Sequence, residues 1–91
     1  MAIKKIIIAD DHSFIRLGLI QILKDEFPGI EIIETADGES LVKEVRQQDF
    51  DLVISDLDMP GRNGLEALEQ IKQIKPHLPV LILSIYADEL Y

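Results

Sequence analysis

Short apolar runs alternate with stretches of helical periodicity along the whole chain. Runs rich in β-branched residues predict four buried strands, at residues 3–9, 30–33, 52–54 and 80–83. Apolar residues at three- and four-residue spacing predict three helices between these strands. Ser13 and Asp37 are the expected N-caps of the first two helices, and Pro28-Gly29 ends the first. Strand-helix alternation with short connections predicts an α/β domain, with a parallel sheet covered by helices on both faces.

Polar residues directly follow three of the predicted strands. Asp10 and Asp11 follow the first, Asp56 the third and Ser84 the fourth. Ligands of such sheets bind beyond the carboxyl ends of the strands, so we expect these side chains to meet there. Two carboxylates about 5 Å apart repel by roughly 3 kcal/mol at an effective dielectric of 20, so the group would stay partly protonated or bind a cation. Oxygen ligands with no histidine or cysteine nearby select a hard ion, and Mg²⁺ suits a site completed by water and a phosphate.

Composition narrows the class of protein. Nine basic against seventeen acidic residues give a net charge of −8, which opposes nucleic-acid binding by this segment. The absence of cysteine excludes disulfides and thiolate metal sites and fits the reducing cytoplasm. The apolar run near the N-terminus is too short for a secretory signal, or for a membrane span of about 20 residues. We therefore expect one small cytoplasmic domain.

The acidic positions and their surroundings resemble a known family. Asp10-Asp11, Asp56 within LVISDLDMPG, and Ser84 are similar to the receiver domain of bacterial response regulators in two-component signalling. The stretches ADDHSFIRLGL, DLDMPGRNGLEAL and LILSIYADE resemble the NarL/FixJ subfamily in particular. The resemblance runs from about Ile3 to Tyr91 and implies a flavodoxin-like, doubly wound sheet of strand order 2-1-3-4-5.

The resemblance also implies roles for single residues. Asp56 would accept a phosphoryl group from a partner histidine kinase. Asp10, Asp11, Asp56 and the main-chain carbonyl of Asp58 would ligate Mg²⁺, with Asp11 as the direct ligand of the first pair and Asp10 more a water-mediated one. Ser84 would hydrogen-bond the phosphoryl group and move on activation. Apart from this self-catalysed phosphotransfer, we expect a signalling domain rather than an enzyme.

The chain departs from the family at its C-terminal end. Receiver domains usually have five βα units, whereas this chain ends at Tyr91, where the fourth helix would begin. We therefore expect residues 1–91 to be the N-terminal part of a receiver domain, with strand order 2-1-3-4 and no output domain. The lysine of the missing strand has no counterpart, which predicts weaker stabilisation of the phosphoryl charge. An unpaired apolar edge predicts self-association. A full-length regulator of this subfamily would continue into a DNA-binding domain that controls transcription.

Several interpretations remain open. DLDMPG is also similar to the D-x-D motif of haloacid-dehalogenase-like phosphatases, although a strand carrying Asp10-Asp11 precedes it and Pro60 replaces the expected threonine or valine. A non-phosphorylated interaction module, either a degenerate receiver or a fragment, is the second alternative. His12 is interpreted as an exposed residue without a role. Apolar residues near the start of the first helix serve core packing or, as the family implies, dock a kinase helix: Phe14, Ile15 and Leu17.

Overall fold

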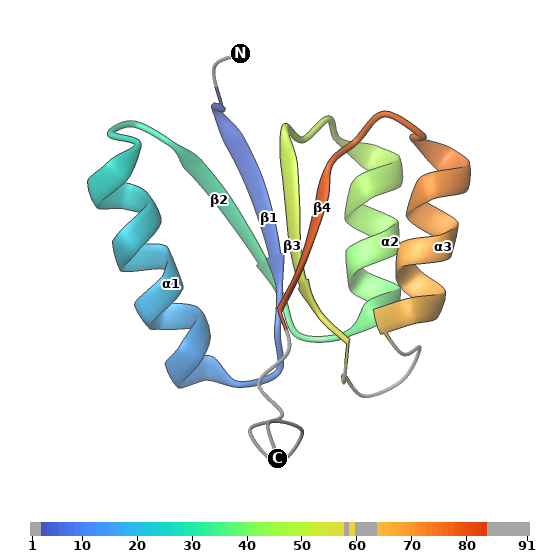
Figure 1. Ribbon diagram of the computed structural model, residues 1–91, viewed down its shortest axis with the longest axis horizontal. Helices are drawn as coiled ribbons and strands as arrows, with labels where there is room; N and C mark the ends of the chain where they lie inside the picture. Colours follow the sequence, from blue (N-terminus) through green and yellow to red (C-terminus); the bar gives the residue numbers. More distant parts are fainter. Residues whose placement is uncertain (1–2, 58, 60–63, 84–91) are drawn as a thin grey trace, which may run out of the picture.

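Strands and helices alternate strictly along the chain (Figure 1). The structure is a computed structural model that describes residues 3–57, 59 and 64–83. The elements are β1 (Lys5–Ala9), α1 (Ser13–Glu26), β2 (Glu31–Thr35), α2 (Gly38–Gln47), β3 (Leu52–Asp56), α3 (Gly64–Ile74) and β4 (Val80–Leu83). All strand pairs are parallel and their order is β2-β1-β3-β4. The α/β fold and the 2-1-3-4 order expected from the sequence are confirmed.

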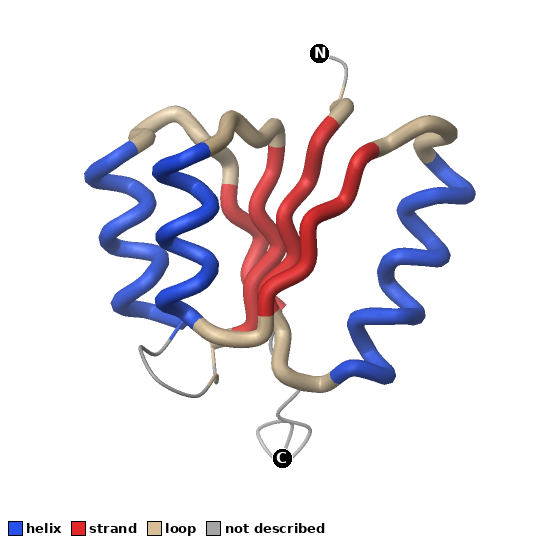
Figure 2. The backbone as a smooth tube through the Cα atoms, turned by 180° about the vertical axis from the view of Figure 1, so that it is seen from behind, coloured by secondary structure: helices blue, strands red, loops and turns tan. Residues whose placement is uncertain are grey.

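Helices cover both faces of the sheet, with α1 on one face and α2 and α3 on the other (Figures 1 and 2). Successive side chains of a strand point to opposite faces, and β1 shows this directly. Ile6 and Ile8 pack in a cluster with buried residues of α1, whereas Ile7 and Ala9 pack with those of α2 and α3. All four side chains are fully buried. Continuous burial on two faces explains why β1 is an uninterrupted apolar run.

Of the two N-cap residues predicted from the sequence, one is confirmed and the other is wrong. Asp37 caps α2, because its carboxylate accepts the Ser40 N–H at 2.7 Å. The prediction that Ser13 caps α1 is wrong, since Ser13 is the first helical residue and His12 is the cap, without a side-chain cap hydrogen bond. The extended cap backbone lies at His12 because its N–H is bonded to the Asp10 carboxylate at 2.7 Å.

Two strands reach further toward their carboxyl ends than the apolar runs indicate. β2 includes Glu34 and Thr35, which pair with Ile8 and Ala9 of β1. β3 includes Ser55 and Asp56, which pair with residues of β4. Backbone pairing continues through these polar residues because the partner strands supply donors and acceptors there. The extension carries polar side chains to the carboxyl edge of the sheet. Each described helix is too short or too polar to cross a bilayer.

At the opposite edge, Asp51 ties β3 to the start of β1. Its Oδ2 accepts the backbone N–H of Lys4 at 2.8 Å and that of Lys5 at 3.0 Å. These two hydrogen bonds, the Lys4 bond first, lower the pKa of Asp51 below its usual 3.8. The folded chain therefore favours the ionised carboxylate more than the unfolded chain does. This preference stabilises the fold above the pKa of the unfolded chain and is lost as the pH falls through the folded pKa.

We expect Asp51→Asn to flatten the acid limb of the stability curve. The asparagine oxygen still accepts hydrogen bonds, but it carries no charge to be lost below about pH 4. Thermal unfolding followed by circular dichroism between about pH 2 and pH 7 measures the effect, with Asp25→Asn on α1 as the matched control. Acid limbs of equal slope for wild type and Asp51→Asn would contradict the assignment.

Candidate functional site

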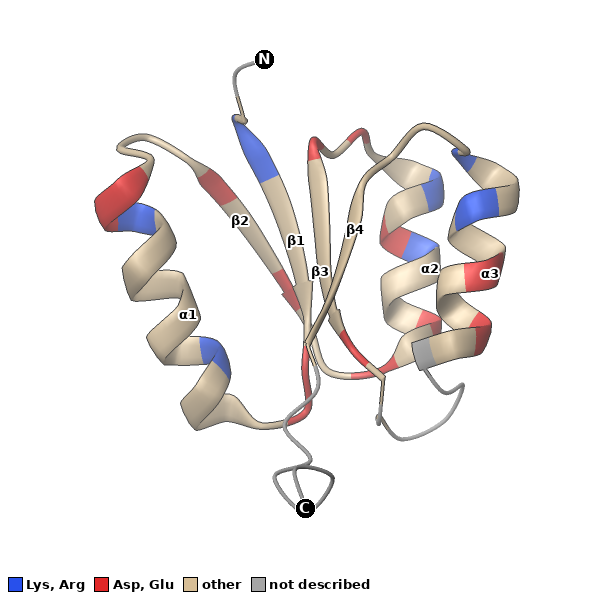
Figure 3. Cartoon of the chain, in the orientation of Figure 1, with Lys and Arg blue, Asp and Glu red and all other residues tan. Residues whose placement is uncertain are grey.

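Three carboxylates meet at the carboxyl edge of the two central strands. Asp10 and Asp11 directly follow β1, and Asp56 is the last residue of β3. β1 and β3 are paired, with Ala9 opposite Ser55, and acidic positions lie side by side at their ends (Figure 3). Ligand atoms of Asp10, Asp11, Asp56 and His12 all lie within 4.8 Å of one another. The convergence expected for the three aspartates is therefore present. Asp58 and Ser84 lie outside the described residues.

Two of these carboxylates are buried. Asp10 is 1% exposed and Asp56 is 2% exposed, whereas Asp11 is open to solvent. Burying a carboxylate is costly unless it has partners. Asp10 accepts the His12 N–H, and no buried side-chain oxygen or nitrogen in the described part of the chain lacks a hydrogen-bond partner. The site therefore combines two fixed, desolvated acids with one that is accessible to an incoming ion.

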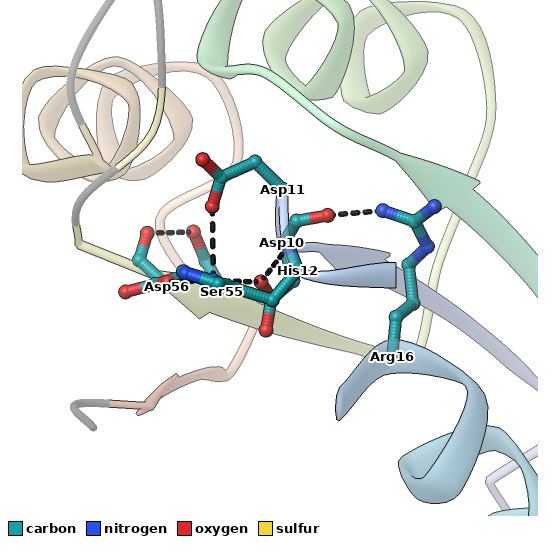
Figure 4. A network of polar contacts seen from close by, with 6 residues as sticks. All are labelled: Asp10, Asp11, His12, Arg16, Ser55 and Asp56. Carbon is teal, nitrogen blue, oxygen red and sulfur yellow. Dashed lines mark hydrogen bonds and ion pairs between the residues drawn. The ribbon is translucent and has the colours of Figure 1, made fainter. Parts of the chain in front are cut away.

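The imidazole of His12 lies among the carboxylates (Figure 4). Its Nδ1 is 3.0 Å from Asp10 Oδ1, 3.1 Å from Asp11 Oδ1 and 3.5 Å from Asp56 Oδ2. The hydrogen bond to Asp10 raises the pKa of His12, and the charges of Asp11, Asp10 and Asp56 add to this effect against partial desolvation. The premise that no histidine lies near the acids is wrong.

A local signal in the sequence accounts for the position of His12. An aspartate often accepts the N–H of the residue two positions later, which forms a turn. Asp10 and His12 have this spacing, and the hydrogen bond that defines the turn is present. The turn brings the ring back toward the end of β1. The sequence interpretation treated His12 as an isolated residue and missed this contact.

The neighbouring strand β2 and helix α1 support the loop that carries Asp10 and Asp11. The Asp10 N–H donates to the Thr35 carbonyl at 3.1 Å. Arg16 of α1 donates from Nη1 to the Asp10 carbonyl, and from Nε to Glu34 Oε1 at 2.9 Å. Sequence reasoning did not single out Thr35, Arg16 or Glu34, because their contacts depend on β2 lying beside β1.

The donor set fits a hard divalent cation. Carboxylate oxygens are the preferred ligands of Mg²⁺ and Ca²⁺ in proteins, and three carboxylates are gathered here from two adjacent strand ends. Their mutual repulsion is relieved when a cation lies between them. Because Asp11 is open to solvent, an ion can reach the group without a change of fold. This acidic cluster could hold a metal ion.

Comparison with known proteins identifies the family. The response regulator receiver domain matches residues 6–91. The chain belongs to this receiver family. The resemblance drawn from the motifs, including its NarL/FixJ character, is thereby confirmed. The glycerol metabolism activator of Pseudomonas putida is 42% identical over 86 residues, which cover 93% of this chain and 39% of that protein. The receiver chain thus spans about two fifths of the length of such curated relatives.

Solved receiver structures share the fold. The response regulator TrrA of Thermotoga maritima, in complex with Mg²⁺-BeF, is 35% identical to this chain with a TM-score of 0.85, covering 93% of this chain and 72% of that one. TrrA in complex with the histidine kinase ThkA is 36% identical with a TM-score of 0.82, covering 92% of this chain and 71% of that one. The flavodoxin-like fold is confirmed.

Proposed function

We propose that Asp56 accepts a phosphoryl group from the phosphohistidine of a sensor kinase. The observation that carries this proposal is the position of Asp56, at the end of β3, with ligand atoms of Asp10 and Asp11 within 4.8 Å. The solved complex of TrrA with the histidine kinase ThkA supports a kinase as the partner. Residues 1–91 are then the N-terminal part of a receiver domain, and the remainder of the regulator lies outside this chain.

Asp10, Asp11 and Asp56 would hold Mg²⁺ in this proposal, together with the main-chain carbonyl of Asp58, which lies outside the described residues. The Mg²⁺-BeF complex of TrrA supports this choice of ion. When bound, the ion neutralises negative charge as the phosphoryl group approaches the carboxylates. Asp11 is the accessible member of the group, and we assign it the direct contact. Asp10 keeps its hydrogen bond to His12 and serves more through water.

The chain's own residues then perform the transfer. An Asp56 carboxylate oxygen forms a bond to phosphorus while the bond from phosphorus to the kinase imidazole nitrogen breaks, so the imidazole leaves with the electron pair. The product is an acyl phosphate on Asp56. Burial of Asp56 at the end of a paired strand fixes the direction of its carboxylate. Ser84, which lies outside the described residues, is proposed as the switch residue that bonds the phosphoryl group.

Labelling of the chain by acetyl phosphate tests the proposal. With Mg²⁺ present, we expect stoichiometric incorporation that is stable to acid, labile to hydroxylamine and mapped to Asp56 by mass spectrometry. Asp56→Asn should take up no label, whereas Asp25→Asn on α1 should be labelled like the wild type. Rapid turnover of a generic phosphomonoester without retained label would favour the phosphatase alternative. Absence of any label would favour the passive interaction module.

We also propose that this 91-residue chain self-associates through exposed apolar surface. Leu81 of β4 is 52% exposed, and it pairs with Ile54, which faces α1, so it lies on the same face of the sheet. On α1, Phe14 is 87% exposed and Leu17 59% exposed. Apolar area of this kind favours association. Light scattering that shows only monomers would contradict this part of the proposal.

The role proposed for the parent regulator rests on the receiver family and on the net charge of this chain. The net charge of −8 opposes contact with nucleic acid by this segment, so DNA binding is assigned to an output domain outside the chain. The parent regulator would act in the cytoplasm, receive its signal from a sensor kinase and control transcription. Exposed Phe14 and Leu17, near the site, are the side chains that we assign to kinase docking.

A further inference from the structure

We propose that Arg16 is a positioning residue that aims the carboxylates of the β1–α1 loop at Asp56. This inference rests on the proposed metal site. The guanidinium of Arg16 joins two groups that belong to different elements. It donates to the Asp10 carbonyl after β1 (Figure 4) and to the Glu34 carboxylate of β2. A planar guanidinium holds two acceptors at a fixed angle, which a flexible ammonium does not.

The contacts of Arg16 fix one particular peptide group. The Asp10 carbonyl accepts the Arg16 Nη1–H, and the Asp10 N–H on the other side of the residue donates to Thr35 of β2 at 3.1 Å. The backbone of Asp10 is therefore held at both its donor and its acceptor. The peptide that carries the Asp10 carbonyl also carries the Asp11 N–H. Rotation of this peptide changes the dihedral angles on both sides of it and would swing the Asp11 carboxylate away from Asp56.

Arg16 is itself well anchored. Its side chain is only 18% exposed, and its Nε donates to Glu34 Oε1 at 2.9 Å. Its own N–H donates to the His12 carbonyl at 3.0 Å, in the first turn of α1. The side chain thus starts from a rigid helix and ends on a paired strand. Removal of residues that hold metal-binding groups in place commonly weakens metal affinity by about 10- to 100-fold.

Charge and positioning predict opposite effects on cation binding. Arg16 carries a positive charge close to a site proposed to bind Mg²⁺. If Arg16 acted through its charge alone, its removal would strengthen Mg²⁺ binding, because like charges repel. If Arg16 holds the loop in place, its removal weakens binding. The sign of the change therefore separates the two roles.

Calorimetric titration of the 91-residue chain with Mg²⁺ measures this sign. We expect Arg16→Ala to weaken binding by about tenfold. We expect Arg16→Lys to remain weaker than wild type although it keeps the charge, because lysine does not hold both acceptors. Glu34→Gln should weaken binding less, and the double variant should be no weaker than Arg16→Ala, since both act through one contact. Arg46→Ala in the last turn of α2 is the matched control, because Arg46 forms no ion pair with the described residues, and it should leave affinity unchanged.

Mg²⁺ binding by Arg16→Ala as tight as that of the wild type, or tighter, would overturn the inference. A second readout separates this outcome from failure of the metal site itself. In the metal-free chain, amide resonances of Asp11 and His12 should shift in Arg16→Ala and in Arg16→Lys, with an unchanged far-ultraviolet spectrum. If wild type binds no Mg²⁺, the proposed function fails, and unchanged Asp11 and His12 resonances would then overturn the positioning role independently.

Discussion

Asp56→Asn is expected to stabilise the metal-free chain and to weaken its Mg²⁺ binding at the same time. Asp10 and Asp56 are nearly fully buried, and the ligand atoms of the acidic cluster lie within 4.8 Å of one another. A pair of like charges at this separation repels by about 3 kcal/mol at an effective dielectric of 20. Contacts with His12 offset part of the repulsion, so we expect a gain of about 1–3 kcal/mol in the free energy of unfolding.

Urea unfolding in the presence of a chelator, and again in excess Mg²⁺, measures both effects. The order of stability should reverse when Mg²⁺ is added, because an ion that binds only the folded wild type stabilises it by mass action. Asp25→Asn, which removes the same charge from α1, should shift both curves little. A metal-free Asp56→Asn chain that is less stable than the wild type would show that the carboxylates do not repel one another in the folded state.

Ile71→Ala is expected to remove a large part of the free energy of unfolding of the chain. Ile71 of α3 is fully buried, in the cluster that joins α2 and α3 to Ile7 of β1 and Val53 of β3. Removing this side chain from a packed core costs about 2–5 kcal/mol. Small domains have only about 5–15 kcal/mol of stability in total, and a short chain lies near the lower end of that range.

Ile22→Ala is the matched control for this prediction. Ile22 belongs to α1, but it is 60% exposed, so the same change of side chain removes little buried area. We expect its unfolding midpoint in urea, followed by circular dichroism, to stay close to that of the wild type. Equal midpoints for Ile71→Ala and Ile22→Ala would show that the cluster around Ile71 does not determine stability.

The fold could be read from the sequence because burial and pairing act on whole segments. β1 and β3 are apolar over their length since both of their faces are covered, and that property is visible in the order of residues. The strand ends were less predictable. Glu34, Thr35 and Ser55 belong to strands through backbone pairing, which no hydrophobic pattern reveals. The cap of α1 lies at His12, not at the predicted Ser13, because the turn at Asp10 fixes the backbone of His12.

The acidic site could be predicted only in part, for a related reason. Parallel pairing of neighbouring strands brings Asp10, Asp11 and Asp56 together, so their meeting follows from topology. The contacts of His12 and Arg16 depend on how side chains turn within the folded molecule. Arg16 contacts the Asp10 carbonyl and also Glu34, which β2 brings beside the end of β1. Prediction of the Arg16 contacts requires the neighbouring strand, whereas the turn that places His12 has a local signal in the spacing of Asp10 and His12.

The connection between β1 and α1 is very short, since β1 ends at Ala9 and α1 begins at Ser13. Asp10, Asp11 and His12 therefore form the whole link, without a flexible spacer. A protein that docks on the exposed Phe14 and Leu17 would contact a helix that is joined almost directly to the residues proposed to bind the ion. If a bound ion changes the affinity for such a partner by some factor, the bound partner changes the affinity for the ion by the same factor. Binding of a partner and binding of a cation would then be thermodynamically coupled through the start of α1.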